Sequence, residues 1–342
     1  MKQLASTTSR RSFDLAVAGV VIGLFASVPW WADKGLVFLA SVVLINATFA
    51  LSFNLVFGLT GLVSFGHAAY FAAGAYTTGL LLQSYSQVPF PLAWLAAGIA
   101  GGLVAAAVAV VALRRASGIY FAILTLALAE LVHILISKSD LLGREDGMTG
   151  IKRPVMDFGL FRLDLAQGNN LYYVTLVCVS FLALILYILW HNRYGRLLAA
   201  IRQDAERVRF LGINVHAMRF SAFVASGAFA GLAGGLYAPA AQLLTPEIAH
   251  WGYSALPILF CLVGGVAYFW GPVAGAVIFI GLEHMTRNIV GLSEILIGAV
   301  LLLVVLAFPG GVIGGAQRLL AAGRRGTSAN GSSESKIQGQ TS

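Results

Sequence analysis

Long apolar runs separated by short polar turns dominate the chain. The stretch from Gly35 to Leu113 holds 79 residues without Asp, Glu, Lys or Arg, and one helical crossing of a bilayer core takes about 20 apolar residues. This stretch therefore accommodates three crossings, with turn-forming residues at Gly58–Gly66 and Gln83–Pro91. Over the whole chain the same pattern predicts about ten membrane-spanning helices, at 14–31, 36–57, 67–82, 92–113, 118–136, 171–190, 220–239, 254–270, 272–290 and 293–308.

The predicted fold class is all-α, a polytopic helical membrane protein. The runs lack the alternation of apolar and polar positions that strands of a membrane barrel require. Composition agrees, because 58% of the residues are hydrophobic and 11% are charged, against about 25% charged in soluble domains. A soluble enzyme and a nucleic-acid-binding module are excluded. The two cysteines, Cys178 and Cys261, lie inside apolar runs, so no disulfide framework or metal-ligand spacing is expected.

Lysine and arginine gather in alternate segments of the chain. They concentrate in residues 1–13, after the fourth span, in 191–219 and in 311–342, whereas five basic and five acidic residues balance in 137–170. The predicted spans between the basic segments number four, two and four, so the positive-inside rule places both termini in the cytoplasm and 137–170 outside. The net charge of +8 then faces the cytoplasm and anionic lipid rather than nucleic acid.

The two ends of the chain are predicted from the same pattern. Residues 1–13 form a cytoplasmic N-terminus and 14–310 the transmembrane domain. The first span is expected to be a retained helix rather than a signal peptide, because Pro29 would directly follow the cleavage site. Residues 311–342 form a cytoplasmic tail whose end, from Gly323, has no apolar face and is expected to be disordered.

The cytoplasmic segment 191–219 has a helical pattern of its own. Its 29 residues exceed what a turn between two helices needs, and they predict one amphipathic helix over Arg196–Leu211 with Gly212 as its C-terminal cap. The apolar positions of that helix are Leu197, Leu198, Ile201, Ala205, Val208 and Leu211. The pattern leaves two interpretations open: the helix lies on the lipid surface, or it inserts into a groove of a soluble partner.

Glycines recur at spacings typical of closely packed membrane helices. Gly227, Gly231 and Gly235 follow one another at intervals of four, as do Gly271 and Gly275. Small residues at this spacing let two helices approach closely, so a packing role is expected for both sets.

The Gly58–Gly66 turn is different, because irregular backbone at membrane depth leaves polar groups unpaired unless it lines a cavity. Transporters use such broken helices to bind substrate. The residues hypothesised to line a substrate pathway are Asn54, Thr60, Ser64, His67 and Glu130. A structural contact that closes the Ser64–His67 turn is an equally open interpretation for His67.

Glu130 lies in the fifth predicted span, one helical turn before His133. An ionisable group at membrane depth is costly and points to function, although an interhelical hydrogen bond or a position near the interface explains Glu130 as well. Glu-x-x-His is half of a di-metal motif, but the second copy that such a site needs is missing. No metal site is expected.

Several sequence blocks, taken in order, resemble the branched-chain amino acid ABC transporter permeases, and among them the M-type subunit. The blocks are 54–58, 60–61, 64–69, 74–76, 121–123, 125–126, 129–130, 194–202, 210–214, 228–237, 246–247, 264–265, 270–272 with Gly275, and 308–311. They extend over residues from about 36 to 314 and so cover nearly the whole membrane domain. The chain departs from the family pattern at Arg144–Asp146 and at Ala267–Tyr268, and the first departure lies in the outward segment.

The resemblance implies the permease of an ABC importer in the bacterial inner membrane that moves Leu, Ile or Val inward. Related importers carry urea, short amides or other amino acids. No lysine follows a glycine, so the chain lacks a phosphate-binding loop of the P-loop type. ATP would therefore be hydrolysed on partner subunits, and no enzyme activity or cofactor is expected in this chain. An independent secondary carrier is a weaker alternative, and no Ser/His/Asp set supports a membrane enzyme.

The implied partners are a second homologous permease, two ABC ATPases and a periplasmic substrate-binding protein, all alongside membrane lipid and without nucleic acid. Segment 191–219 would be the coupling segment that docks on an ATPase. The residues expected to take part are Arg196, Leu197, Ile201, Arg202, Asp204, Val208, Leu211 and Gly212.

Overall fold

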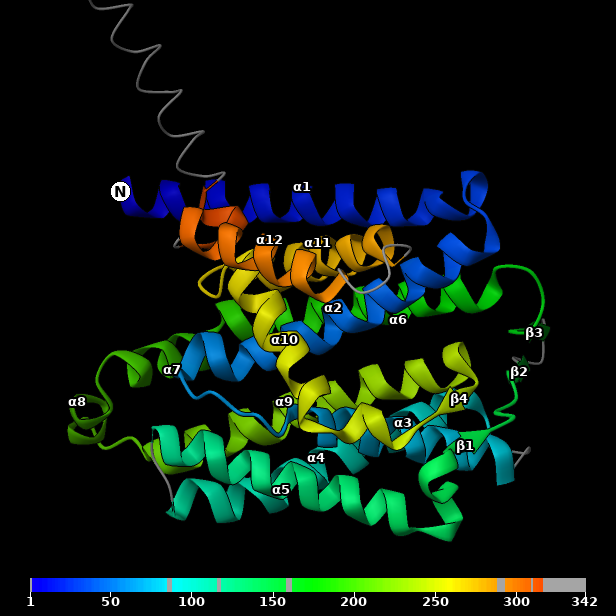
Figure 1. Cartoon of the computed structure of the whole chain (residues 1–342). Coiled ribbons are helices and arrows are strands. Elements are labelled where there is room, and N and C mark those ends of the chain that lie inside the picture. The colour runs from blue at the N-terminus through cyan, green and yellow to red at the C-terminus, as the bar shows by residue number, and fades with distance from the viewer. Residues whose placement is uncertain are drawn as a thin grey trace, which may run out of the picture. The chain divides into compact units, whose positions relative to one another are not determined.

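A computed structural model describes residues 2–84, 88–115, 118–157, 162–287, 293–308 and 310–315. It confirms the all-α membrane fold, since each of the ten predicted spans coincides with a helix (Figure 1). These helices are α1 (Lys2–Trp31), α2 (Lys34–Thr60), α3 (His67–Ser84), α4 (Phe90–Arg115), α5 (Ile119–Lys138), α6 (Asn170–His191), α9 (Val215–Ala241), α10 (Trp251–Gly264), α11 (Gly271–Thr286) and α12 (Ser293–Ala307).

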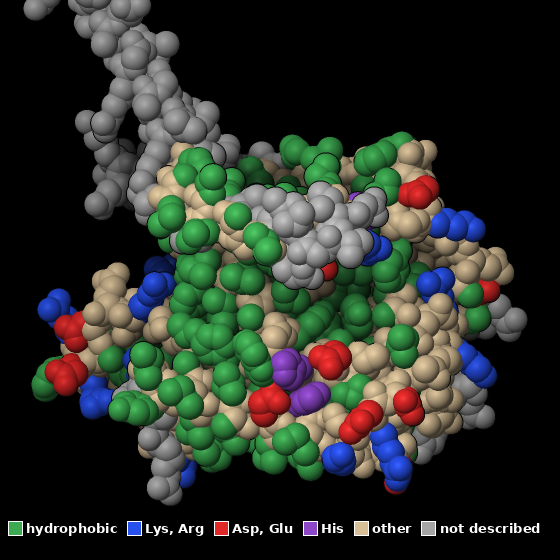
Figure 2. Space-filling view, viewed as in Figure 1, with side chains coloured by type: hydrophobic (Ala, Val, Ile, Leu, Met, Phe, Trp, Pro, Cys, Tyr) green, Lys and Arg blue, Asp and Glu red, His purple; other side chains and the backbone are tan. Residues whose placement is uncertain are grey.

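Among the residues that the structure describes, five helices are long and apolar enough to cross a bilayer: α2, α4, α5, α6 and α9. Figure 2 shows many exposed hydrophobic side chains on one face, and charged side chains gathered around α8 (Ala205–Phe210). Exposed apolar side chains in such number suit a protein embedded in lipid. The number of crossings and the side of each terminus stay predictions.

Helix boundaries differ from the predicted spans where local capping decides them. The first helix already begins at Lys2, within the predicted N-terminal segment. The eighth predicted span reaches residue 270, but α10 ends at Gly264 because Gly265 has a φ of 114°, which glycine adopts at low cost. The ninth reaches residue 290, whereas α11 ends at Thr286 and 288–290 lie outside the described residues. The expected disorder from Gly323 onward also falls outside them.

The chain divides within α10 into two compact units, Met1–Pro257 and Ile258–Ser342. In the first unit, α9 packs against α2, α3 and α4 (Figure 1). The glycines of α9 make this packing close. A Cβ on Gly101 of α4 would lie 2.5 Å from the carbonyl oxygen of Gly227, and one on Gly234 would meet the carbonyl oxygen of Phe71 in α3. The predicted packing role of these glycines is confirmed.

The second unit shows the same device between α10 and α11. A Cβ on Gly275 would meet the carbonyl oxygen of Phe260, and one on Gly271 would meet that of Gly265. The rings of Phe260 and Phe279 lie beside this contact in an edge-on arrangement, 5.3 Å apart. The spacing of Gly271 and Gly275 thus marks a helix–helix contact.

Two small antiparallel sheets interrupt the helices in the predicted outward segment 137–170. Strand β1 (Met148–Thr149) pairs with β4 (Leu243–Leu244), which follows α9 in the sequence. Strand β2 (Val155–Asp157) pairs with β3 (Arg162–Asp164). Short 3-10 turns flank them, η1 (Asp140–Leu142), η2 (Arg144–Asp146) and η3 (Pro246–Ala249). The sequence pattern gave no signal for these two- and three-residue strands, because they are too short to show alternation.

Candidate functional site

Helix α2 breaks at Gly61, and the chain runs irregularly to His67, where α3 begins. The break has a local cause, since Gly61 adopts a φ of 74° and its amide donates to the carbonyl oxygen of Phe57. Residues 61–66 therefore form the junction that the sequence singled out, and it lies between two largely buried helices.

Side-chain hydroxyls satisfy the backbone amides of this junction. The amide of Phe65 donates to Oγ1 of Thr125 on α5 (3.2 Å), and that of Ala68 donates to Oγ of Ser254 on α10 (2.9 Å). Within the junction, Ser64 Oγ accepts from the Gly66 amide (3.2 Å). Thr60 Oγ1 likewise accepts from the Leu62 amide (3.4 Å). Hydroxyls thus do here what water would do outside a membrane, because an unpaired amide in an apolar environment is costly.

His67 begins α3 and is buried, with its ring among the aromatic rings of Phe49, Phe53 and Tyr70. Its Nε2 lies 2.9 Å from Oγ of Ser52 on α2. The Ser52 hydroxyl donates its hydrogen to the carbonyl oxygen of Phe49 (2.7 Å). A hydroxyl has one hydrogen to donate, so His67 must donate from Nε2. The imidazole therefore ties α3 to α2.

Asn54 is fully buried, and both polar atoms of its carboxamide lack a hydrogen-bond partner among the described residues. Its neighbours include Gly58 and the indole of Trp190. A Cβ added to Gly58 would lie 2.6 Å from Asn54 Oδ1 and 2.6 Å from Cη2 of Trp190. A buried polar group without a partner costs about 1–3 kcal/mol. Natural structures contain few such groups, and each one calls for an explanation.

Glu130 forms a cluster of its own, with two histidines. Its Oε1 accepts from the backbone amide of Trp251 (2.9 Å) and so caps the start of α10. Its Oε2 lies 3.4 Å from Nδ1 of His133, and its Oε1 lies 3.8 Å from Nε2 of His250. Within the described part of the chain, no group of three or more His, Cys, Asp or Glu side chains is placed to hold a metal ion. The interhelical hydrogen bond that the sequence left open for Glu130 is present.

The structure therefore divides the hypothesised pathway residues. Thr60, Ser64 and His67 meet at the α2–α3 junction, Asn54 lies two turns earlier on α2, and Glu130 belongs to the separate cluster at the start of α10. A role of these five residues in a substrate pathway stays a prediction.

The segment between α6 and α9 contains two helices where the sequence predicted one. They are α7 (Arg193–Gln203) and α8 (Ala205–Phe210). Asp204 separates them in an extended conformation, with φ −157° and ψ 97°, and its side chain accepts from the Arg207 amide (2.9 Å). The prediction of one helix through Asp204 was wrong because an aspartate at this point caps a new helix. Gly212 does end the segment, with a φ of 80°.

Within the coupling segment 191–219, the apolar face of α7 and α8 packs mostly on the chain's own helices. Leu198, Ile201 and Val208 are buried. The tip is different, since Phe210 is 89% exposed and Leu211 is 75% exposed. Neither the lipid surface nor the groove of a soluble partner can therefore cover the whole apolar face. A partner or the lipid surface can reach only the tip and the exposed charged side chains.

Arg202 connects this segment to the α2–α3 junction. Its Nη1 donates to the carbonyl oxygen of Gly58, in the last turn of α2. Its aliphatic stem lies over Gly61, where an added Cβ would meet Arg202 Cγ at 3.3 Å. The carbonyls at a helix end have no partner within the helix, and they carry a partial negative charge that a cation complements. Arg202 thus caps α2 from another helix.

A second contact joins the coupling segment to α9. Tyr194 Oη lies 3.0 Å from Ser221 Oγ, and Ser221 gives its own hydrogen to the carbonyl oxygen of Met218. Tyr194 is therefore the donor. Burial raises the pKa of the Tyr194 phenol above its ordinary value. The phenol keeps its proton at neutral pH, and the contact persists across the physiological range.

Comparison with known proteins decides the family. A sequence model of the family described as "Branched-chain amino acid transport system / permease component" matches residues 35–305. The chain belongs to this permease family. The match includes the α2–α3 junction, the coupling segment and the Glu130 cluster, and it confirms the resemblance found in the sequence blocks.

Individual relatives place this permease more closely. It is 28% identical to the "High-affinity branched-chain amino acid transport system permease protein LivM" of Escherichia coli (strain K12), over 90% of this chain and 76% of that protein. A "Probable branched-chain amino acid transport permease protein LivH" of Methanocaldococcus jannaschii is 27% identical over 72% of this chain and 75% of that protein. The greater share of the permease that aligns with LivM agrees with the M-type resemblance.

A third relative is named for a different substrate. The "Guanosine ABC transporter permease protein NupQ" of Bacillus subtilis (strain 168) is 28% identical, over 36% of this chain and 38% of that protein. No solved structure matches this permease.

The sequence missed two features of the site. It gave no partner for Arg202, because the acceptor is a backbone carbonyl 144 residues away. It also did not single out Ser52, Thr125 or Ser254, because an isolated hydroxyl inside an apolar run resembles many others. The glycine-rich break itself was the available signal, since its unpaired amides require acceptors from neighbouring helices.

Proposed function

We propose that this chain is the M-type permease subunit of a bacterial inner-membrane ABC importer that moves Leu, Ile and Val inward. The observation that carries the proposal is the family match over residues 35–305, together with the alignment to LivM over 90% of the chain. ATP hydrolysis takes place on partner subunits, and this chain supplies part of the translocation path without chemistry of its own.

Four partners complete the assembly: a second, homologous permease, two ABC ATPases and a periplasmic substrate-binding protein. LivM-like and LivH-like relatives both match the chain, which supports a permease pair. The coupling segment offers its exposed tip, Phe210 and Leu211, to a cytoplasmic ATPase. Arg207 and Arg209 are exposed beside that tip, so the groove that receives it is apolar with an acidic rim.

The contacts of the coupling segment support a route for movement from the ATPase to the membrane domain. When the ATPases close, they displace α7 and α8 together. Arg202 then pulls on the last turn of α2, directly before the junction at residues 61–66. Irregular backbone deforms more readily than a helix, since it lacks the regular i to i−4 ladder. The junction is therefore where α2 and α3 change their relative position, next to His67 and Asn54.

A second candidate substrate class is a nucleoside, because the guanosine permease NupQ matches part of the chain. The share of the chain that it covers is less than half of the share aligned with LivM. The amino-acid proposal therefore ranks first, and one transport assay separates the two.

The deciding experiment measures uptake of radiolabelled leucine in cells with and without this chain, and with and without the ATPase subunits. Unlabelled valine, guanosine and urea serve as competitors. Loss of leucine uptake after removal of either the chain or the ATPases, with competition by valine alone, establishes the importer and its substrate class. Competition by guanosine instead assigns the nucleoside class. Uptake that persists without any ATPase overturns the proposal in favour of a secondary carrier.

A further inference from the structure

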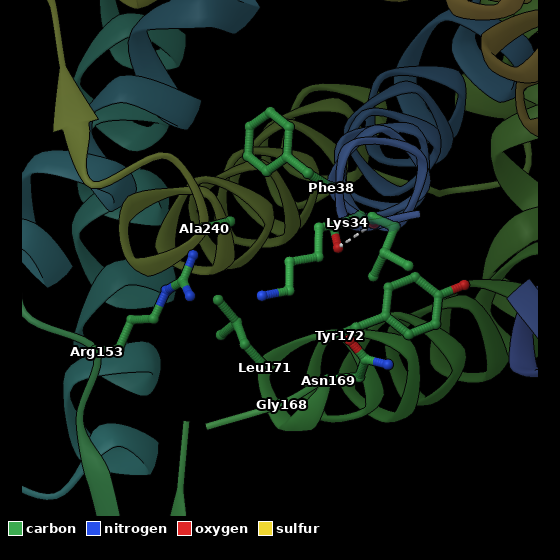
Figure 3. A pocket seen from close by; sticks show the side chains of 10 residues that line it. Lys34, Phe38, Arg153, Gly168, Asn169, Leu171, Tyr172 and Ala240 are labelled. Atoms are coloured by element: carbon green, nitrogen blue, oxygen red, sulfur yellow. Dashed lines mark hydrogen bonds between the residues drawn. The ribbon is translucent and has the colours of Figure 1, made fainter. Parts of the chain in front are cut away.

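A pocket of about 220 Å³ opens between the start of α2, the start of α6 and the end of α9 (Figure 3). All of its lining residues belong to the first unit, and none of them belongs to the α2–α3 junction at residues 61–66. Its walls are formed by Lys34, Val37, Phe38, Ser41, Arg153, Gly168, Asn169, Leu171, Tyr172 and Ala240. Arg153 and Gly168–Asn169 belong to segment 137–170, which is predicted to face outward.

Two cationic side chains, Lys34 and Arg153, face each other across this pocket. Figure 3 shows the Lys34 ammonium and the Arg153 guanidinium pointing toward one another from opposite walls. None of the described lining residues is acidic. Asp33 precedes Lys34 but does not line the pocket, and its Oδ1 accepts from the Leu36 amide (3.0 Å). Like charges that face each other without a counter-ion repel, and an anion between them removes that repulsion.

The guanidinium is held in place by the protein. Arg153 Nε donates to the carbonyl oxygen of Pro239 in α9 (3.3 Å), and the residue is half-buried. This leaves the two terminal nitrogens of the fork for a ligand. Arginine presents paired donors that match a carboxylate in geometry, and such bonds are about twice as strong as neutral ones. The arginine is therefore oriented before a ligand arrives.

The pocket also has an apolar wall. Val37, Phe38, Leu171 and Ala240 line the wall beside the cations. The hydroxyls of Ser41 and Tyr172 already donate to backbone carbonyls, of Val37 and Phe25. A volume of about 220 Å³ lies below the roughly 300–1,000 Å³ of sites for drug-sized ligands. The pocket thus suits one small molecule that has an anionic end and an apolar body.

We propose that this pocket is an entry site that binds a small apolar amino acid by its carboxylate, between Lys34 and Arg153, with the side chain against the apolar wall. The proposal rests on the proposed function, because it names the first contact of the permease with the amino acid that a binding protein releases. Recognition is by charge at one end and by apolar surface at the other.

The test measures ligand binding by saturation-transfer NMR. The full-length chain is purified with the subunits that co-purify with it and is placed in neutral phosphatidylcholine nanodiscs. The probes are leucine, 4-methylpentanoate, which lacks the ammonium group, and leucinamide, which lacks the carboxylate. We expect leucine and 4-methylpentanoate to bind and leucinamide to fail. Arg153→Gln and Lys34→Gln should each weaken leucine binding by about tenfold to a hundredfold, as expected for loss of a charge-assisted bond.

Lys152 provides the matched control, since it is exposed, adjacent to Arg153 and absent from the lining. Lys152→Gln should bind leucine as the unchanged protein does. Arg153→Lys and Lys34→Arg keep the charge and should retain most of the binding, which separates loss of the cation from misfolding. Equal leucine binding in Arg153→Gln, Lys34→Gln and Lys152→Gln overturns the proposal.

A lipid phosphate is the competing source of the anion. If phosphatidylglycerol in the nanodisc displaces leucine only from variants that keep both cations, the carboxylate site stands. If anionic lipid co-purifies through Arg153 and no free carboxylate binds, the proposal is overturned. The uptake assay separates this outcome from failure of the proposed function. Normal leucine uptake by Arg153→Gln and Lys34→Gln would overturn the entry site while leaving the proposed importer intact. If the unchanged protein shows no leucine uptake, both the entry site and the proposed function are overturned.

Discussion

Arg202, in the last turn of α7, donates a hydrogen bond from its guanidinium Nη1 to the carbonyl oxygen of Gly58, in the last turn of α2. A helix in the coupling segment thereby caps the end of a helix in the membrane domain. The cap lies three residues before Gly61, where α2 gives way to the irregular junction. This contact, made by one side chain, links the coupling segment to that junction.

Replacement of Arg202 by Ala should uncouple transport from ATP hydrolysis while the protein still inserts and folds. The lost bond is exposed and worth only about 0.5–1.5 kcal/mol of stability, so expression and thermal unfolding should change little. Leucine uptake should fall severalfold, and Arg202→Lys should restore part of it. Parallel measurements of uptake and ATPase activity check this, with Arg193→Ala, on an exposed side chain of α7, as control. Full uptake in Arg202→Ala would remove Arg202 from the coupling route.

A stronger lesion in the same segment combines Arg202→Glu with a proline inside α7. Proline removes a helical hydrogen bond and clashes with the preceding turn, at a cost of about 3 kcal/mol. Transport should be abolished while membrane insertion is kept, since α7 lies outside the five apolar spans. Membrane fractionation with an uptake assay provides the measurement. ATPase activity that still responds to substrate would contradict the proposed docking.

Replacement of Phe210 and Leu211 by Ser should weaken assembly with the ATPases without loss of stability. Both side chains are largely exposed in this chain, so folding does not depend on their burial. Co-purification of the ATPase subunits with the double variant should drop, and the same exchange at the buried Val208 should instead destabilise the permease itself. Undiminished co-purification would place the docking surface elsewhere.

Asn54 allows stability and transport to be separated. Replacing its unpaired carboxamide with Leu removes a desolvation cost of about 1–3 kcal/mol, although the added bulk beside Trp190 offsets part of that gain. We therefore expect Asn54→Leu to be at least as stable as the unchanged protein and to transport poorly if Asn54 lines the pathway. Thermal unfolding in detergent and leucine uptake are compared. Normal uptake would show that Asn54 does not contact substrate.

Adjacent glycines on α4 provide a test of close helix packing. A Cβ on Gly101 would lie 2.5 Å from the carbonyl oxygen of Gly227, whereas the nearest atom to a Cβ on Gly102 is Ala228 Cβ at 3.4 Å. Gly101→Ala should lower stability by about 1–3 kcal/mol through overpacking. Gly102→Ala should be neutral or slightly stabilising, because alanine favours helix. Thermal unfolding of both variants decides, and equal stability would contradict the close contact.

Sequence patterns predicted the helices well and their ends less well. Apolar runs indicated where helices lie, because burial in lipid demands long uncharged segments, and the glycine spacing of α9 predicted its packing. The end of α10 depended instead on the backbone of Gly265, and the division of the coupling segment depended on the capping side chain of Asp204. Both are local choices that hydrophobic periodicity does not encode.

The candidate site was predictable only in part, for a related reason. The break at Gly58–Gly66 carries its own composition signal, so the sequence singled out Ser64 and His67, which the structure places at the α2–α3 junction. The acceptors that complete it come from elsewhere in the chain, and Lys34 faces Arg153 only after α2 and the loop before α6 have come together. Such pairings depend on tertiary packing, which one sequence does not reveal.

The hydroxyls that satisfy the α2–α3 junction also have a consequence for biogenesis. Phe65 finds its acceptor on Thr125, 60 residues later, and Ala68 finds its acceptor on Ser254, 186 residues later. A nascent chain that has delivered only α2 and α3 to the membrane must leave these amides to water or to transient partners. The junction therefore reaches its final form late in synthesis, after α10 has left the ribosome, and chains truncated before Ser254 should carry an incomplete junction that quality-control proteases can recognise.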